Sequence, residues 1–337
     1  MSSTRIKGIE IYHPDNIVNY KYFVDKYKKD YGKDIERLLL ACGKQDRYLI
    51  KKEDVDENSL TMAIKAAKKV LENCNLSGEE INMLVYSTQT PEYNCPPNSA
   101  IIATEISLNS GAIIFDQNVN CTGMLIGLMT IDAMMKSNPN IKRALLIGSD
   151  NFSAICNEDN EYTYPMTADA ACAVILERTD ENDVGVLDYQ EINYLNKNDP
   201  PYNYVRFPKN GLKKSFDDTA YDRRTYWPNG LNVKVLPEII KRSHSLIESR
   251  SGISVKDIDT FIPSQYTPGI IKKVMQVLDA DAEKAVYYGD KCGYTGTSSP
   301  FVALYYALKE GKIKRGDLLS FWTYGLHWTT GTLIMRF

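Results

Sequence analysis

The feature that most constrains the fold of this chain is an internal repeat. The segment SGEEINMLVYSTQTP, residues 77–91, aligns without gaps on SVKDIDTFIPSQYTP, residues 254–268, and Ser, Ile, Ser, Thr and Pro recur in register. The two copies lie in halves with a similar order of strands and helices, so we interpret the chain as a tandem duplication. Two such halves bury a pair of sheets between helix layers, which predicts an α/β core with a pseudo-twofold axis.

The repeat also suggests where the halves divide. We expect the first half to span residues 1–176 and the second half residues 177–337. Residues 188–228 interrupt the second half, because this stretch is rich in Tyr, Asn, Asp and Pro and has no clear period. Its aromatic residues favour an ordered, lid-like insertion over a flexible linker.

One cysteine lies in a predicted turn between a strand and a helix, a position typical of nucleophilic residues. Residues 112–119 are predicted as a strand, Cys121 occupies the turn that follows, and an apolar helix begins near Met124. A thiol at a helix N-terminus is close to unpaired amides and to the positive end of the helix dipole, which favour a thiolate. The alternative is a buried structural cysteine, the commoner role for a lone thiol at such a junction.

Pseudo-symmetry predicts which parts of the second half lie near this thiol. Equivalent loops of the two halves meet across the axis, so the turns at Ser264, Tyr294 and His327 are expected to face Cys121. The other two histidines are poorer candidates for a catalytic role. His13 lies in an N-terminal turn, and His244 lies on the polar side of a helix. We expect both to be solvated.

Charge and cysteine usage exclude several classes of function. The net charge of −3 gives no general attraction to nucleic acid or to an anionic membrane. No apolar run approaches the roughly 20 residues of a membrane span, and the first residues show no signal-peptide pattern. The seven cysteines form neither CxxC pairs nor a Cys/His ligand pattern, which argues against disulfides and a metal site. We therefore expect a cytoplasmic protein without a metal centre.

The order of several segments resembles a known family. FDQNVNCTGM, TADAACAVIL, DIDTFIPSQYT and GDKCGYTGTSS follow one another as in the ketoacyl-acyl-carrier-protein synthase III group, and the resemblance covers nearly the whole chain. It implies the thiolase-like layered α-β-α-β-α fold, made of two tandem pseudo-symmetric halves. It also implies a homodimer, no tightly bound cofactor, and an acyl thioester of acyl carrier protein or coenzyme A as substrate. Cys121 falls on the cysteine that carries the acyl group.

The resemblance also exposes two departures from the family's Cys-His-Asn triad. The family histidine lies in an Ile-Pro-His-Gln segment, where this chain has Ser264, and the asparagine lies in a Gly-Asn-Thr segment, where it has Tyr294. A serine and a tyrosine do not reproduce the imidazole and amide that stabilise a developing enolate. His327, in the glycine-rich loop before the last strand, is a candidate replacement base. A packing role between Tyr324 and Trp328 is an equally good interpretation.

The same loop is expected to contribute to the oxyanion hole. In the family, a backbone amide of this loop and the amide of the cysteine bind the oxyanion. Here the loop runs from Gly325 through Leu326 to His327, and Trp328 follows at the substrate pocket.

One further departure bears on the size of the acyl group. The family has a large apolar residue before the proline of the Pro-rich loop, which crosses the dimer interface and closes the acyl pocket. This chain has Cys95 there, which predicts room for a longer or bulkier acyl group. The alternative is that Tyr93 or Phe301 fills the gap.

The coenzyme A contacts of the family are also altered. Its Trp and Arg near the end of the first long helix fall near Arg37 and Ala41, and the Arg after its histidine falls on Gly269. Their loss favours a donor bound to acyl carrier protein over coenzyme A.

These observations lead to one main hypothesis and two alternatives. The main hypothesis is an acyltransferase of specialised metabolism, in which Cys121 passes the acyl group to a small-molecule acceptor such as an amine, an alcohol or a thiol. The first alternative is carbon–carbon (Claisen) condensation of the 3-oxoacyl-ACP synthase III type, with His327 as base. The second is a non-catalytic partner subunit of a heterodimeric synthase.

Overall fold

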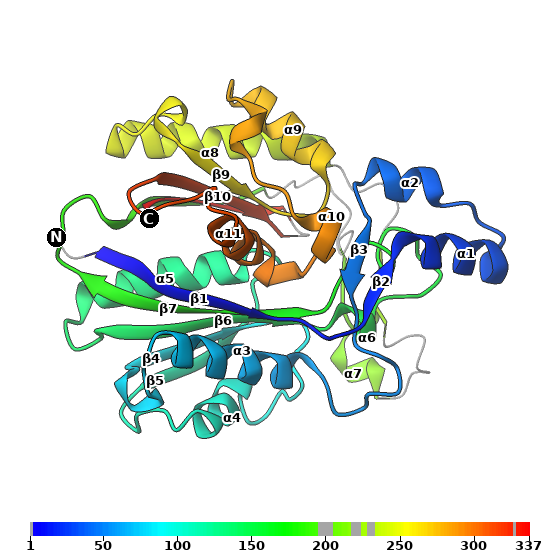
Figure 1. Cartoon of the computed structure of the whole chain (residues 1–337), viewed down its shortest axis with the longest axis horizontal. Coiled ribbons are helices and arrows are strands. Elements are labelled where there is room, and N and C mark those ends of the chain that lie inside the picture. Colours follow the sequence, from blue (N-terminus) through cyan, green and yellow to red (C-terminus); the bar gives the residue numbers. More distant parts are fainter. Residues whose placement is uncertain (1–2, 195–204, 217–223, 228–232, 326–327) are drawn as a thin grey trace.

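The computed structural model of the chain describes residues 3–194, 205–216, 224–227, 233–325 and 328–337. Two β-sheets lie face to face, with helices between them and on both outer sides (Figure 1). This is the layered α-β-α-β-α arrangement of the thiolase-like fold, as the sequence predicted.

The first sheet contains five strands in the order β1-β7-β6-β4-β5. Strand β4 runs parallel to β5 and β6, whereas β7 is antiparallel to β6 and β1. The bounds are β1 Ser3–Tyr12, β4 Met83–Ser87, β5 Ile113–Gln117, β6 Arg143–Asp150 and β7 Ala170–Thr179.

The second sheet repeats most of this order. Its four strands follow the order β8-β11-β10-β9, with β9 parallel to β10, and with β11 antiparallel to β10 and β8. Strands β9, β10, β11 and β8 therefore correspond to β4, β6, β7 and β1. The bounds are β8 Gly185–Asn193, β9 Thr260–Pro263, β10 Leu318–Tyr324 and β11 Thr329–Arg336.

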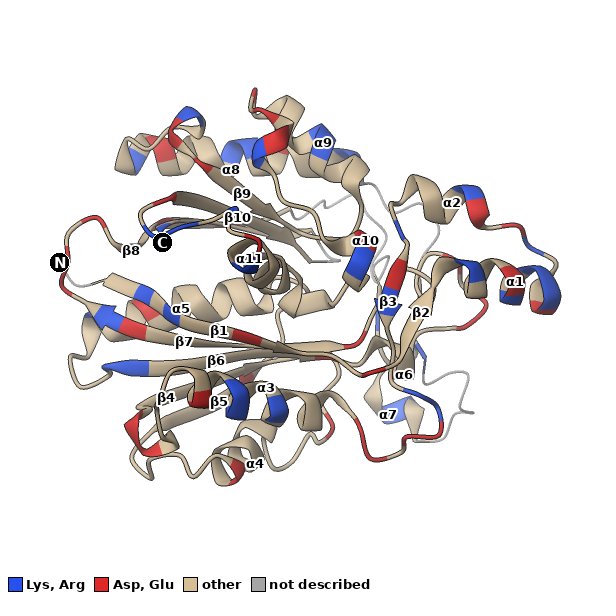
Figure 2. Cartoon of the chain, in the orientation of Figure 1, with Lys and Arg blue, Asp and Glu red and all other residues tan. Residues whose placement is uncertain are grey.

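Helices form three layers around the sheets. α5 (Gly123–Ser137) and α11 (Ser299–Lys309) lie between them, α3 (Ser59–Asn73) and α4 (Asn98–Glu105) cover the first sheet, and α8 (Leu236–Ser251) and α9 (Pro268–Val277) cover the second. The sequence explains the difference between layers. α3 buries an alanine-rich stripe and exposes lysines, whereas α5 is apolar on most faces because sheets pack on both of its sides. Charged residues accordingly concentrate on the outer helices, and α5 is largely free of them (Figure 2).

The internal repeat is visible in the backbone. The 3-10 helices η1 (Gly78–Glu80) and η3 (Val255–Asp257) each precede the parallel strand of their half, and each begins with a capping box. Ser77 pairs with Glu80 in one and Ser254 with Asp257 in the other, the residues that the alignment places in register. Both halves therefore keep the capping box at the start of the repeated segment.

A smaller subdomain packs at one end of the sheets. It contains β2 (Ile17–Asn19), β3 (Asp46–Tyr48), α1 (Tyr20–Tyr31) and α2 (Glu36–Ala41). α1 and α2 are separate helices, because Gly32 adopts a left-handed conformation (φ 65°) that ends α1. The remaining short elements are α6 Phe152–Ile155, α7 Leu212–Ser215, α10 Gly289–Cys292, η2 Val233–Val235, η4 Ala282–Lys284 and η5 Gly296–Ser298.

The division of the chain at residue 176 stays a prediction. The first sheet takes its strands from residues 3–179 and the second from residues 185–336. Within the lid-like insertion predicted over residues 188–228, residues 188–193 belong to β8, and residues 195–204, 217–223 and 228 lie outside the described residues. Within the part of the chain that the structure describes, no helix combines the length and apolarity that crossing a membrane requires.

Candidate active site

The turn between β5 and α5 holds Cys121 at the boundary between the two halves. Asn120 has a positive φ of 51°, and Thr122 donates its hydroxyl to the Val119 carbonyl at 2.6 Å, so the turn is tight. Thr323 of β10 donates to the Cys121 carbonyl at 3.3 Å, which ties the turn to the second sheet. The Cys121 side chain is buried, with 3% of its surface exposed.

Burial dominates the electrostatics of this thiol. It raises the pKa of Cys121 to about 12, although hydrogen bonds from Tyr294 and Gln89 oppose the shift and the Asp150 charge adds to it. The sequence-based expectation of a thiolate favoured by the helix N-terminus is therefore wrong for the free enzyme, because desolvation of the charge outweighs the helix amides. Acylation of Cys121 requires loss of the thiol proton as a donor binds.

Gln89, which the sequence analysis did not single out, is held against the thiol. Its side-chain Nε2 lies 3.8 Å from Cys121 Sγ and donates to Asp150 Oδ2 at 3.0 Å. The buried Asp150 carboxylate also accepts the backbone N–H groups of Gln89 at 2.7 Å and of Thr297 at 2.9 Å. Burial raises the pKa of Asp150 to about 6, and these donors oppose the shift. The amide of Gln89 is thus fixed with one N–H towards the sulfur.

Two of the residues predicted from the second half also reach the thiol region. Tyr294 is 5% exposed and hydrogen-bonds Cys121, and burial raises the pKa of its phenol well above the usual value. Ser264 lies close enough to Tyr294 and Tyr324 to lower their pKa values against that effect. Its own buried hydroxyl has no hydrogen bond of ordinary geometry within the described residues. The structure therefore brings Cys121, Ser264 and Tyr294 together.

The glycine-rich loop is only partly described. The Gly325 amide donates to the Thr329 carbonyl at 2.7 Å, so it is already engaged, and the Trp328 amide donates to the Gly325 carbonyl at 2.9 Å. Trp328 is 7% exposed and lines the cavity beside Cys121. Leu326 and His327 lie outside the described residues, so an oxyanion role for their amides and a base role for His327 stay predictions.

Cys95 does not line this cavity within the described chain. Its side chain is exposed, and Tyr93 is 48% exposed. Phe301 is fully buried in the layer between the sheets, where it stacks on Phe321. The role of Cys95 as a pocket stopper across a dimer interface stays a prediction.

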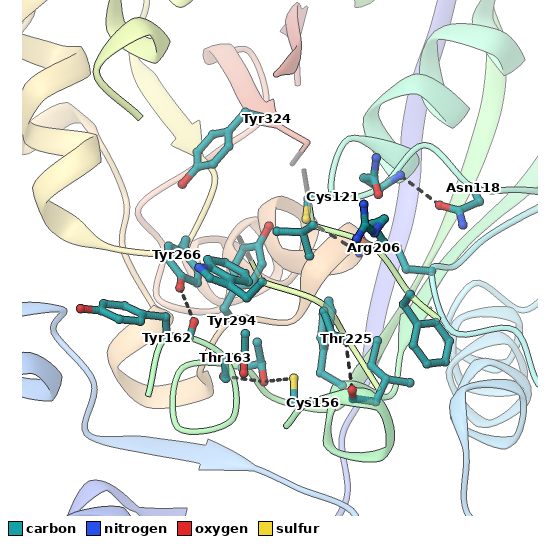
Figure 3. A pocket seen from close by; sticks show the side chains of 18 of the residues that line it. Asn118, Cys121, Cys156, Tyr162, Thr163, Arg206, Thr225, Tyr266, Tyr294 and Tyr324 are labelled. Atoms are coloured by element: carbon teal, nitrogen blue, oxygen red, sulfur yellow. Dashed lines mark hydrogen bonds between the residues drawn. The ribbon is translucent and has the colours of Figure 1, made fainter. Parts of the chain in front are cut away.

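The cavity beside Cys121 has a volume of about 140 Å³. Aromatic side chains from several elements converge on it (Figure 3). Phe152 comes from α6, Tyr266 from the turn before α9, Tyr294 from the loop after α10, and Tyr324 from the end of β10. Cys156, a second buried thiol, also lines it.

The two other histidines are not solvated as predicted. His244 is 5% exposed, and its ring nitrogens lie 2.9 Å from the Ile240 carbonyl and 2.9 Å from Ser320 Oγ. Its neighbours on α8 are polar, but the side chain points to β10 and completes a buried hydrogen-bond chain. His13 stacks on the Tyr48 ring with centroids 3.6 Å apart.

A buried lysine binds the two backbone segments that precede or follow Ser264 and Tyr294. Lys44 is fully buried, and its Nζ donates to the carbonyls of Gln265 at 3.4 Å and of Gly289 at 3.2 Å. Gln265 follows Ser264, and Gly289 begins the short helix before Tyr294. Lys44 therefore links the backbone segments that position these two side chains.

Comparisons with known proteins indicate one family for both halves of the chain. Residues 115–194 match the family described as 3-oxoacyl-[acyl-carrier-protein (ACP)] synthase III, and residues 249–337 match its C-terminal family. The chain is 30% identical over 284 residues to the beta-ketoacyl-[acyl-carrier-protein] synthase III of Actinobacillus pleuropneumoniae, covering 84% of this chain and 85% of the relative. It is 26% identical to the protein of that name from Alkalilimnicola ehrlichii, over the full length of both.

Solved structures show the same fold. The 3-oxoacyl-[acyl-carrier-protein] synthase III of Aquifex aeolicus superposes with a TM-score of 0.81 at 23% identity, covering 99% of this chain and all of that chain. The priming beta-ketosynthase of the R1128 polyketide pathway superposes with a TM-score of 0.85 at 17% identity, covering 99% of this chain and 96% of that chain.

Proposed function

The chain belongs to the 3-oxoacyl-[acyl-carrier-protein] synthase III family and is an enzyme of the acyltransferase class. We propose that it forms a carbon–carbon bond. Cys121 takes an acyl group from a thioester of acyl carrier protein or coenzyme A, and the acyl group then joins a carbon of a second thioester. The reaction needs no bound cofactor or metal. We place it in the cytoplasm and propose that it acts as a homodimer.

The buried thiol at the base of a cavity shared by both halves is the observation that carries this proposal. Relatives of similar length are named beta-ketoacyl-[acyl-carrier-protein] synthase III, which favours condensation over transfer to an amine, alcohol or thiol, the main hypothesis from the sequence. A thiol is the group that such chemistry loads, and Cys121 lies at the start of α5 with two hydrogen-bond donors aimed at its sulfur.

The first half-reaction uses Cys121 and the two groups that donate to its sulfur. As the thiol loses its proton, the sulfur attacks the thioester carbonyl, a new C–S bond forms, and the donor thiol leaves with the proton. The phenol of Tyr294 and the amide of Gln89 stabilise the thiolate by donating to it. We propose that the oxyanion is bound by the Cys121 amide and by the amide of Leu326 or His327, since the Gly325 amide already donates to the Thr329 carbonyl.

The second half-reaction requires a carbon nucleophile. When the second thioester is malonyl-type, its carboxylate leaves as carbon dioxide, the carbanion attacks the acyl carbonyl, and the Cys121 thiolate is released. Tyr294 stands where the family has an asparagine, and its phenol can donate to the enolate oxygen. Ser264 and Tyr294 occupy the positions of the family's histidine and asparagine, and we propose that His327 supplies the base in place of that histidine, which makes this member atypical.

Transfer to a heteroatom acceptor remains the second candidate because of one observation. Among the described residues that line the cavity there is no histidine, and a serine hydroxyl is a poor general base at neutral pH. An acceptor that needs only deprotonation would make fewer demands on the site than a decarboxylation does.

Mass spectrometry of the intact protein tests the first step. Incubation with acetyl, butyryl and longer thioesters of coenzyme A and of acyl carrier protein should add one acyl mass to the wild type and none to Cys121→Ala. Cys156→Ala is a matched control, because this thiol lines the same cavity and burial raises its pKa to about 12 as well. Loading that survives in Cys121→Ala and disappears in Cys156→Ala would refute the assignment.

The second step is tested by the product. Malonyl-acyl carrier protein should discharge the acyl enzyme to a 3-oxoacyl product with release of carbon dioxide. Discharge by amines, alcohols or thiols alone would favour the second candidate, and no loading at all would favour the non-catalytic partner subunit.

The base is tested by two substitutions. His327→Ala should lower the rate on the order of 100-fold, and Ser264→Ala much less. The reverse pattern would assign the base role to Ser264.

A further inference from the structure

The walls of the cavity beside Cys121 are built from rings held in fixed orientations. Phe152 and Tyr294 lie nearly parallel, with centroids 6.4 Å apart and an interplanar angle of 27°. Tyr266 meets Tyr294 edge-on, with centroids 5.2 Å apart at 84°. Phe152, Tyr294 and Tyr324 are each less than a tenth exposed. Close packing on all sides leaves these rings little freedom to move aside.

The volume of the cavity limits the group that enters it. Its value of about 140 Å³ is close to that of an apolar protein cavity of roughly 150 Å³ that binds one benzene molecule. A single six-membered ring fits this space, and a long alkyl chain exceeds it. The cavity is therefore matched to a compact group rather than to a fatty acyl chain.

The polar side chains on one part of the wall satisfy one another. Cys156 Sγ lies 3.5 Å from Thr167 Oγ1, and Thr167 in turn donates its hydroxyl to the Thr163 carbonyl at 3.1 Å (Figure 3). These groups make their hydrogen bonds within the protein, so they do not require a polar substituent on the ligand. This part of the wall presents a surface suited to an apolar edge.

We infer that the acyl group loaded onto Cys121 is a single-ring aromatic acyl group of the benzoyl type. This inference rests on the proposed acylation of Cys121 and names the substrate class of that site. A ring that meets Phe152, Tyr266 and Tyr294 gains edge-to-face or offset contacts that a saturated group of equal size lacks. Each such contact favours the aromatic group by roughly 2- to 10-fold beyond burial of the same area.

A panel of small thioesters tests the inference on the full chain. N-acetylcysteamine thioesters carrying acetyl, benzoyl, cyclohexanecarbonyl and decanoyl groups are compared by the second-order rate constant for loading Cys121, followed by intact mass. Benzoyl should load at least roughly 10-fold faster than decanoyl, and faster than cyclohexanecarbonyl, its saturated counterpart of similar size. Equal rates for benzoyl and cyclohexanecarbonyl would overturn the aromatic assignment, and faster decanoyl loading would overturn the size limit.

A substitution in the wall provides a second readout. Phe152→Leu should lower the ratio of benzoyl to cyclohexanecarbonyl loading several-fold, because it keeps an apolar side chain but removes a ring. Tyr22→Leu is the matched control, since Tyr22 is an exposed aromatic residue of α1 outside the cavity. An unchanged ratio in Phe152→Leu would count against the inference.

The outcome also separates this inference from the proposed function. If acetyl or alkyl groups load onto Cys121 and benzoyl does not, the aromatic substrate class is wrong and the acyl-enzyme mechanism stands. If none of the four groups loads, the acyl-enzyme mechanism fails and the substrate class fails with it.

Discussion

The buried lysine behind the active-site loops should make the stability of this protein depend on pH. Burial and the nearby Arg47 charge lower the pKa of Lys44 from its usual 10.5 to about 7, although Asp290 and two thiols oppose the shift. In the unfolded chain the ammonium keeps its ordinary pKa. Between pH 7 and 10.5 the unfolded state therefore binds more protons than the folded state, so the folded state gains stability as pH rises.

The magnitude follows from the two pKa values. Each pH unit in this window is worth up to about 1.4 kcal/mol in the free energy of unfolding. Integration from pH 7 to pH 9, with Lys44 half protonated at the start, gives about 2 kcal/mol. Burial raises the pKa of several cysteines, so these thiols lower the free energy of unfolding as pH rises and oppose the effect of Lys44. The free energy of unfolding of the wild type alone therefore rises less steeply with pH.

The comparison with Lys44→Met isolates the lysine. The free energy of unfolding, from urea titrations followed by circular dichroism at pH 7 and pH 9, is measured for both proteins. The difference, wild type minus variant, should shift by about 2 kcal/mol in favour of the wild type at pH 9, because a methionine side chain does not titrate. The exposed Lys51 supplies the control, Lys51→Met, for which the difference should stay constant. A constant difference for Lys44→Met would refute the reasoning.

Three further predictions concern the thiol, the helix that carries it and the sheet edge. Gln89→Met should raise the pKa of Cys121 further, seen as slower alkylation of the thiol at a fixed pH, because one donor to the thiolate is lost. Gln117→Met, which touches the same helix but not the sulfur, should leave the alkylation rate unchanged. Gly123→Ala should lower the melting temperature and block loading, since a Cβ would sit 2.6 Å from Thr297 Oγ1 and closer still to Ser87 Oγ. Strand β5 lies at the edge of its sheet, so pairing with a second copy should give light scattering at twice 38.2 kDa at micromolar concentration, and a monomer would contradict this.

Patterns in the sequence predicted the fold and part of the site. The repeat and the apolar periodicity predicted two layered sheets, because they report which faces are buried. The strand, turn and helix around Cys121 were predicted for the same reason and agree with β5 and α5. The short repeat even placed Gln89 in register with Tyr266, and both line the cavity, but register alone does not reveal which pair of equivalent residues faces a thiol.

Other properties of the site depend on contacts that no local pattern encodes. The pKa of Cys121 is set by how completely the second half covers the turn, and a helix N-terminus alone suggests the opposite direction. His244 sits among polar neighbours in the sequence, yet its ring reaches Ser320, 76 residues further along the chain. The Asp150 contact that holds Gln89 spans 61 residues. Such long-range pairs become visible only when the chain is folded.

The two serines that the repeat places in register now have different environments. Ser87 Oγ lies 3.0 Å from Thr297 Oγ1, which also accepts the Met124 amide at 2.9 Å at the start of α5. Its partner in the repeat, Ser264, is just as buried, but its hydroxyl has no such bond among the described residues. A buried hydroxyl without a partner costs roughly 1–3 kcal/mol, whereas a satisfied one contributes about 1 kcal/mol. Ser87 therefore stabilises the helix that carries the nucleophile, whereas the Ser264 hydroxyl interacts with the phenols of Tyr294 and Tyr324 beside the thiol.

This difference leads to a paired prediction for equivalent positions. Ser87→Ala should lower the free energy of unfolding by about 1 kcal/mol, because it leaves the buried Thr297 hydroxyl with one partner fewer. Ser264→Ala should lower it less, because the Ser264 hydroxyl interacts with the buried phenols of Tyr294 and Tyr324 but makes no hydrogen bond of ordinary geometry among the described residues. Urea titrations of the two variants at one pH decide the matter, and each variant serves as the control for the other. Equal destabilisation of both would mean that Ser264 is held as firmly as Ser87, and that its hydroxyl belongs to the framework rather than to the reaction.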